Sequence, residues 1–175
     1  MPSSVRPPRM GNGLPGDGRL TRFLFMPSEF SVTRTVEFSE TDMAGIMHFS
    51  NFFRWMEACE AAFYRSLGLP LISFVPGSVV GWPRVRVSCD YKAPLRFNDV
   101  IEVKLFIKEI RSKGVVYVFQ FRKVEAGAVL PLVLAQGEMA AVCVTSGAQG
   151  KMVAQPIPED VRARLEVAPA AAYGE

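Results

Sequence analysis

The chain has 175 residues, enough for one domain with a buried core that needs no disulfides or metals. Its hydrophobic content of 49%, charged content of 21% and net charge of +3 are typical of a globular protein, and they argue against nucleic acid as the main partner. The single histidine, His48, excludes a metal site or proton relay built on several histidines.

The three cysteines, Cys59, Cys89 and Cys143, lie far apart and show no CxxC spacing. This predicts three small buried side chains, with neither a disulfide framework nor a zinc site. No apolar run approaches the roughly 18 residues that a membrane span needs. The stretch from Phe23 to Met26 is too short for the core of a signal peptide. We therefore expect a cytoplasmic, reduced protein.

Three regions follow from the local composition. Residues 1–27 are rich in Pro, Gly, Ser and Arg without any period, which predicts a disordered leader. Because Met26 directly precedes the first strand pattern, it is a candidate for the true start. Residues 28–150 hold the regular patterns and form the predicted domain. Residues 151–175 form a predicted tail, with a short helix over 158–165 and a loose Ala/Pro-rich end.

The first element is a strand, because residues 30–38 alternate between apolar and polar side chains and include β-branched threonines. A loop with a central glycine, Gly45, follows over residues 39–48. Apolar residues then recur every three or four positions, which predicts a helix of about 18 residues, roughly 27 Å long. Ser50 or Asn51 is its expected N-cap, and Gly68 followed by Pro70 marks its end.

Four strand-like runs come next, at roughly 79–92, 99–111, 115–125 and 129–145. Short turn signals separate the last three runs, which leaves no room for crossover helices and predicts antiparallel hairpins. The wide apolar face of the helix indicates that a curved sheet wraps it. The sequence therefore predicts an α+β domain, with one long central helix packed on one antiparallel sheet.

The run from Val36 to Glu57 contains Asp-Met-Ala-Gly at residues 42–45, followed by the aromatic-rich start of the helix. This run resembles the signature of the 4-hydroxybenzoyl-CoA thioesterase family, and the similarity extends over about residues 30–145. The resemblance implies a hotdog fold, in which a five-stranded antiparallel sheet wraps the central helix. It also implies acyl-CoA thioester hydrolysis without a cofactor, since coenzyme A is part of the substrate.

The resemblance assigns roles to individual residues. It implies Asp42 as nucleophile or general base and the backbone amide of Phe49 as oxyanion donor. Glu57 matches a position that is acidic in some members of the family. Gly45 and Asn51 are expected to contact substrate, although Asn51 is better explained as a helix cap. The resemblance further implies a homodimer with active sites at the seam, extended to a dimer of dimers.

The chemistry is consistent with these roles. A carboxylate can serve as nucleophile or general base, and the helix N-terminus offers free N–H groups to a developing oxyanion. Without the resemblance, Asp42 would be read more simply as a turn residue. His48 departs from the commonest family patterns, and it could contact the thioester or be a structural histidine. Glu57 could hold water or the acyl group, or be a solvated helix residue.

Basic residues form a second group. Lys108, Arg111 and Lys113 lie where the resemblance suggests contacts to the phosphates of coenzyme A, a ligand that suits basic side chains. The simpler interpretation is a charged strand edge that prevents aggregation. Arg84 and Arg86 alternate on the second strand and are expected on its solvent face.

Two other functions are compatible with the sequence. A hotdog hydratase or dehydratase could use His48 and Glu57 as acid and base, although its usual histidine motif is absent. A non-catalytic module could bind acyl-CoA without turnover. The aromatic residues at the helix start weakly favour an aromatic or medium-chain acyl group.

Overall fold

A computed structural model describes residues 27–69, 73–75, 78–146 and 151–174, so most of the predicted leader lies outside the described residues. The long elements are β1 (Glu29–Thr35), α1 (Phe49–Ser66), β4 (Arg84–Tyr91), β5 (Val100–Ile110), β6 (Gly114–Glu125) and β7 (Ala128–Val142). The short elements are η1 (Phe38–Glu40), β2 (Ser73–Val75), β3 (Ser78–Gly81), β8 (Val144–Ser146), β9 (Met152–Ala154), α2 (Glu159–Arg162) and η3 (Ala170–Ala172).

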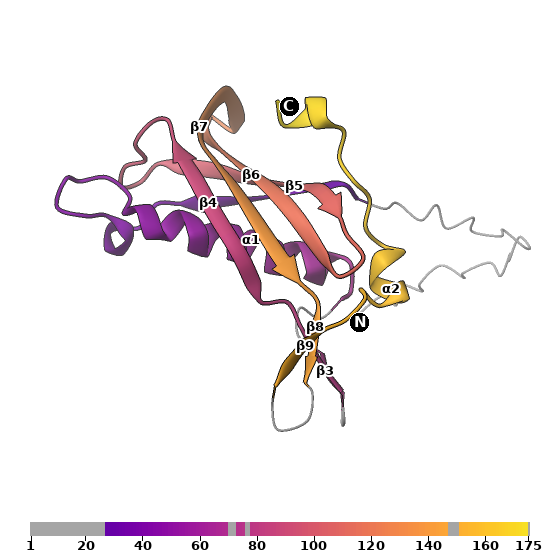
Figure 1. Cartoon of the computed structure of the whole chain (residues 1–175). Coiled ribbons are helices and arrows are strands. Elements are labelled where there is room, and N and C mark those ends of the chain that lie inside the picture. Colours follow the sequence, from indigo (N-terminus) through magenta and orange to yellow (C-terminus); the bar gives the residue numbers. More distant parts are fainter. Residues whose placement is uncertain (1–26, 70–72, 76–77, 147–150, 175) are drawn as a thin grey trace, which may run out of the picture.

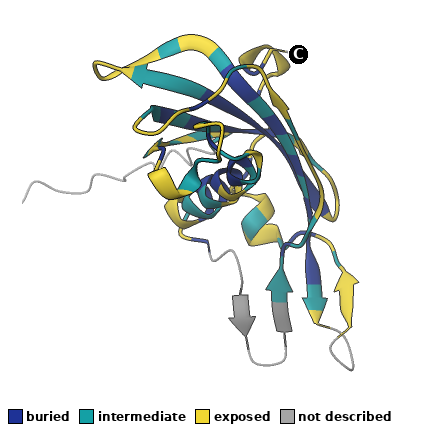
Figure 2. Ribbon diagram, turned by 90° about the vertical axis from the view of Figure 1, so that its left-hand side faces the viewer, coloured by how far each residue is buried: buried dark blue, intermediate teal, exposed yellow. Residues whose placement is uncertain are grey.

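The long strands form one five-stranded antiparallel sheet in the order β1-β5-β6-β7-β4 (Figure 1). As predicted, β5, β6 and β7 are joined by tight hairpins. The helix α1 lies in the hollow of the curved sheet, which Figure 2 shows along the helix axis. The predicted α+β arrangement of a central helix wrapped by a five-stranded sheet is therefore confirmed.

The core lies between α1 and the inner face of the sheet. The buried side chains of α1 recur at helical spacing, and all but two of them are apolar: Asn51, Phe52, Trp55, Met56, Cys59, Glu60, Phe63 and Tyr64. One close approach depends on a glycine: a Cβ atom at Gly137 would lie 2.6 Å from the sulfur of Met56. Gly137 therefore lets the helix settle against β7.

Two of the predicted strand runs are divided in the structure. The run at 79–92 becomes β3 and β4, because Trp82 and Pro83 interrupt it and proline cannot donate to a ladder. The run at 129–145 becomes β7 and β8, separated at Cys143. The short pieces pair in a second small sheet of order β2-β3-β8-β9, which the sequence did not predict.

The main sheet has two edges, β1 and β4. Strand β4 exposes apolar side chains, with Val85 63% and Tyr91 47% accessible. It pairs only with β7 within the described residues, so one row of its backbone groups has no strand partner. An exposed edge of this length is suited to pairing with another strand.

The segment after β9 is part of the folded body. Ile157 and Leu165 belong to the main core, so they are not a peripheral tail. Farther along, the ring of Tyr173 packs on Phe106 at 5.7 Å on the outer face of the sheet, and its carbonyl accepts a hydrogen bond from Gln120. The amide of the buried Ala168 also donates to the carbonyl of Ile107 at 2.8 Å, so the prediction of a loose end beyond residue 165 is wrong.

The cysteines largely follow expectation. All three are free thiols; Cys59 and Cys143 are buried and Cys89 is half-buried. Burial raises the pKa of the Cys59 thiol to about 12 and that of Cys89 to about 11, which makes both unreactive as nucleophiles near neutral pH.

Candidate active site

Asp42 lies in a tight turn between η1 and α1. The amide of Asp42 donates to the carbonyl of Ile46 at 2.9 Å, and its carbonyl accepts from the amide of Gly45 at 3.0 Å. Gly45 has φ of +71°, a conformation that glycine adopts without steric strain. One oxygen of the Asp42 carboxylate accepts from the amide of Ala44 at 2.8 Å. Its second oxygen has no hydrogen-bond partner in the described part of the chain, so it is available for chemistry.

Glu40 joins this turn to the helix. Its carbonyl accepts from the amide of His48 and from the side chain of Asn51, each at 2.8 Å. Its carboxylate accepts from the indole N–H of Trp55 at 2.6 Å and lies 3.9 Å from Arg34. Because Trp55 is fully buried, this bond ties the turn directly to the core. Asn51 therefore secures the loop, and the expectation that it caps the helix is wrong.

The helix begins beside Asp42. His48 is the N-cap: its side chain accepts weakly from the amide of Ser50 at 3.4 Å, and its Nδ1 lies 2.8 Å from the Ser50 hydroxyl. The predicted caps, Ser50 and Asn51, instead lie inside the first turn of α1. The amide of Phe49 is the first of the helix, and no described acceptor is bonded to it. An N–H at this position can donate to an anion and lies at the positive end of the helix dipole.

A pocket of about 530 Å³ opens between these groups. Asp42 lines it together with the helix head and the end of β4: Ile46, Met47, Phe49, Phe52, Tyr91, Lys92, Ala93, Pro94 and Leu95. Tyr91 forms a wall, since its ring packs edge-on against Phe52 at 4.9 Å and its hydroxyl donates to the carbonyl of Phe49 at 3.3 Å. The pocket is thus mostly apolar, with one carboxylate at its border.

Tyr91 and Leu95 line the pocket but were not predicted as site residues from the sequence. The signal was present in the period-two pattern, which places Tyr91 on the same face of β4 as Cys89 and Val87. What the pattern could not show is that this face meets the head of α1. Burial raises the pKa of Tyr91 to about 12, so its hydroxyl remains a donor throughout the neutral range.

Glu57 lies away from this pocket. It is nine residues beyond His48 on α1, which corresponds to roughly 13 Å of helix. Its exposed carboxylate lies 3.6 Å from Arg84 on β4. His48 and Glu57 therefore do not converge on one pocket of this chain.

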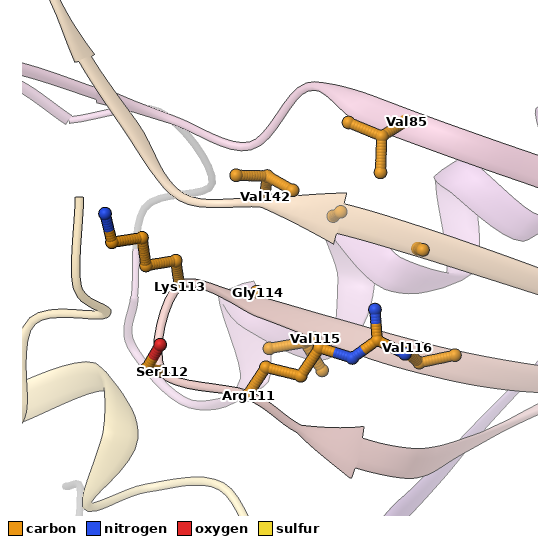
Figure 3. Close-up of a pocket in the computed structure, with 10 residues that line it drawn as sticks. Val85, Arg111, Ser112, Lys113, Gly114, Val115, Val116 and Val142 are labelled. Atoms are coloured by element: carbon orange, nitrogen blue, oxygen red, sulfur yellow. The ribbon is translucent and has the colours of Figure 1, made fainter. Parts of the chain in front are cut away.

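The predicted basic residues lie at the opposite end of the sheet. Arg111 and Lys113 line a second pocket of about 210 Å³ at the β5–β6 turn, with Val85 and Val142 across from them (Figure 3). Arg111 pairs with Glu109 at 2.8 Å, and Lys113 donates to the carbonyl of Ala154 at 3.4 Å. Lys108 pairs with Glu138 at 3.1 Å and does not line this pocket.

The segment after β9 braces the β5–β6 turn. The amide of Ile157 donates to the carbonyl of Ser112 at 2.9 Å, and Arg162 donates to the carbonyl of Arg111 at 3.3 Å. With these carbonyls held by the segment, the side chains of Arg111 and Ser112 line the pocket.

One sequence expectation at this end is wrong. Arg84 and Arg86 were both expected on the solvent face, but Arg84 reaches into the core and forms an ion pair with the fully buried Glu60. The cause is a register shift in β4 between Arg84 and Arg86, which places these two residues on opposite faces of the sheet. A glutamate within the apolar stripe of the helix was the signal that could have revealed a buried partner.

Among the described residues, no group of three or more His, Cys, Asp and Glu side chains is arranged to hold a metal ion. No helix in the described ranges is both long and apolar enough to cross a membrane.

Comparison with known proteins agrees with the geometry. The model of the thioesterase-like superfamily matches residues 36–165, and the chain belongs to this family. The chain is 26% identical to a 4-hydroxybenzoyl-CoA thioesterase of Pseudomonas sp. over 75% of this chain and 94% of the relative. It is 40% identical to a putative esterase of Aquifex aeolicus, but over only 46% of this chain and 62% of that relative.

Solved structures show the same fold. A gentisyl-coenzyme A thioesterase, BH1999, is 29% identical and superposes with a TM-score of 0.64, covering 78% of this chain and all of the other. A 4-hydroxybenzoyl-CoA thioesterase in complex with 4-hydroxybenzoyl-CoA has a TM-score of 0.66 at 19% identity, covering 79% and 99% of the two chains. The predicted hotdog fold and thioesterase family are thereby confirmed.

Proposed function

We propose that this protein hydrolyses an acyl-CoA thioester to the free acid and coenzyme A, with Asp42 as nucleophile or general base. The observation that carries the proposal is that the Asp42 carboxylate and the head of α1 line one pocket. The pocket wall of Phe52, Tyr91 and Leu95 suits an aromatic or medium-chain acyl group. The named relatives that act on 4-hydroxybenzoyl-CoA and gentisyl-coenzyme A support the aromatic alternative.

The reaction uses two features of the site. The free oxygen of Asp42 either attacks the thioester carbon or removes a proton from the attacking water. As the tetrahedral intermediate forms, its oxyanion accepts a hydrogen bond from the amide of Phe49 at the positive end of the helix. One donor of this kind can lower the barrier by roughly 3–4 kcal/mol. The C–S bond then breaks and coenzyme A leaves as a thiolate, a leaving group that needs no strong general acid. Where water attacks, this step yields the free acid; where Asp42 attacks, water then hydrolyses the acyl–Asp42 anhydride to the free acid and the carboxylate.

The coenzyme A part requires a second chain. Asp42 and Arg111 lie at opposite ends of β5, whose 11 residues span roughly 33 Å. Antiparallel pairing of two β4 edges would place the Tyr91 end of one strand beside the Val85 end of the other. We therefore propose a homodimer in which Arg111 and Lys113 of one subunit bind phosphates of the coenzyme A whose acyl group lies in the other subunit.

A substrate panel tests the activity. Benzoyl-CoA, 4-hydroxybenzoyl-CoA and octanoyl-CoA would be incubated with the protein, and the released thiol measured. We expect turnover of at least one of them, and a loss of about 10³-fold in kcat for Asp42→Ala. Asp160→Ala on the exposed helix α2 is the matched control and should behave as wild type. Full activity of Asp42→Ala would refute the mechanism, and no thiol release from any ester would refute the function.

A further inference from the structure

A buried ion pair joins the central helix to the edge strand. Glu60 has no exposed surface, and its Oε2 is paired with Nη2 of Arg84, the first residue of β4. The Nη1 of Arg84 donates to the carbonyl of Trp82 at 3.0 Å, and its Nη2 lies 3.6 Å from Glu57. The guanidinium is therefore fixed in orientation, with contacts to the helix and to the backbone just before its own strand.

The pair has few other contacts. Glu60 Oε1 and Arg84 Nε are buried and have no hydrogen-bond partner among the described residues. The hydroxyls of Tyr64 and Tyr117 bond to each other at 2.9 Å in the same region of the core. Replacing such a pair by apolar residues often leaves a protein as stable or more stable. Stability alone therefore does not explain why an ion pair stands at this position.

The pair lies at a β-bulge. Arg84 pairs with Ala141 and Arg86 pairs with Ala140, so Val85 has no partner on β7. A bulge of this kind redirects side chains and is often found next to sites of function. Here it lets Arg84 reach inward while Val85 lines the pocket of Arg111 and Lys113 (Figure 3). If the bulge moved by one residue, the neighbouring side chains would exchange faces.

We propose that Glu60 and Arg84 are positioning residues for the coenzyme A part of the site. Their pair holds the bulge that places Val85 against the pocket of Arg111 and Lys113. This inference rests on the proposed function, since it takes that pocket to bind coenzyme A phosphates. Neither residue lines the Asp42 pocket, so their loss should alter recognition of coenzyme A and leave the chemistry at Asp42 unchanged.

The experiment compares two thioesters of the same acid. One is the acyl-CoA, and the other is the N-acetylcysteamine ester, which lacks the nucleotide and all phosphates. In Arg84→Met and in the double variant Glu60→Leu/Arg84→Met we expect KM for acyl-CoA to rise about fivefold. KM for the short ester and kcat for both should stay within twofold of wild type. The double variant leaves no unpaired buried charge and keeps the test valid if the single variant fails to fold.

Tyr64→Phe is the matched control, because it removes a buried hydroxyl from the same cluster without touching β4. It should leave the ratio of the two KM values unchanged. An unchanged ratio in both Arg84 variants, or an equal loss of kcat on both esters, would overturn the inference. Calorimetric binding of free coenzyme A supplies an independent readout. If the proposed function is wrong, wild type releases no thiol. If only the inference is wrong, the Arg84 variants bind coenzyme A with the affinity of wild type.

A pH profile gives a further readout that a purely structural pair would not change. Burial raises the pKa of Glu60 to about 7 against the opposing effect of Arg84. The other titratable groups that face it are Glu57, Tyr64, Tyr117 and Cys59. Protonation of Glu60 below pH 7 weakens the pair, so KM for acyl-CoA should rise as pH falls from 8 to 6. In Glu60→Gln, KM for acyl-CoA should vary with pH only as far as the substrate itself titrates. If KM in this variant depended on pH as steeply as in wild type, the proposal would be contradicted.

Discussion

The two ends of the main sheet hold their functional groups by different means. At the Asp42 end, a tight turn and a helix terminus set the geometry, and the backbone makes most of the hydrogen bonds. At the Arg84 end, a buried side-chain pair and a hairpin braced by a distant segment set it. A site built from local backbone geometry is therefore easily recognised in a sequence, whereas one built by side chains from distant elements is not.

The largest expected effect concerns stability at the Arg84 end. The folded protein keeps the proton of Glu60 up to about pH 7, whereas an unfolded chain loses it near the ordinary value of 4.5. Glu60 therefore destabilises the folded state increasingly as pH rises from 4.5 to 7, by about 3 kcal/mol. Urea unfolding from pH 5 to 8 should show most of this loss in wild type relative to Glu60→Gln. Glu57→Gln should parallel wild type, and a constant difference between wild type and Glu60→Gln would refute the prediction.

The next effect belongs to the Asp42 end. Glu40→Ala leaves the indole N–H of the fully buried Trp55 without an acceptor, which should destabilise the fold by about 1–3 kcal/mol. Because the turn that carries Asp42 loosens at the same time, kcat should fall by about tenfold or more. Thermal unfolding and thiol release measure the two effects. Glu40→Gln keeps an acceptor for Trp55 and should recover most of the stability and most of kcat. If Glu40→Gln were as unstable and as slow as Glu40→Ala, the hydrogen bond to Trp55 would be unimportant.

Loss of Arg111, at the Arg84 end of the sheet, should have a smaller effect, on the KM for acyl-CoA. Arg111→Ala should raise KM for acyl-CoA by roughly tenfold and make KM less sensitive to salt, because a phosphate contact is screened by ions. The short N-acetylcysteamine ester should show neither change. Arg65→Ala removes an exposed arginine from the last turn of α1 and serves as control. If Arg111→Ala affected both esters alike, phosphate binding at this turn would be disproved.

The smallest effect is expected from Glu109, which lies beside Arg111. Glu109 pairs with Arg111 at 2.8 Å and competes with any phosphate for it, and the arginine holds the pKa of Glu109 below its ordinary value. Glu109→Gln should therefore lower KM for acyl-CoA by about twofold at low salt and have no effect at high salt. A rise in KM would mean that Glu109 orients Arg111 for the ligand and does not compete with it.

The sequence predicted the elements whose signals are local. The period of the helix, the turn residues between β5, β6 and β7, and the motif around Asp42 each lie within a short stretch of chain. These predicted the α+β fold and the helix, and they led to Asp42 as the candidate carboxylate, which lines a pocket beside the head of α1. The exact cap was missed because His48, Ser50 and Asn51 all have side chains that can accept a hydrogen bond, and the path of the backbone selects among them.

Other features depend on pairing between distant segments and could not be predicted. The bulge at Val85 arises only when β4 meets β7, and it is the bulge that turns Arg84 inward. Glu60 and Arg84 are 24 residues apart, and no local pattern links them. The brace of Ile157 and Arg162 on the β5–β6 turn is likewise visible only once the chain has folded.

The position of Tyr173 has a consequence for biosynthesis. Phe106 and Val118 are covered on the outer face of the sheet by Ala168 and Tyr173, which follow them in the chain by at least 50 residues. While the chain emerges from the ribosome, strands β5 and β6 can pair long before this cover is made, so both apolar side chains stay in contact with water. A nascent or truncated chain that lacks residues 166–174 would therefore expose these apolar side chains to neighbouring chains.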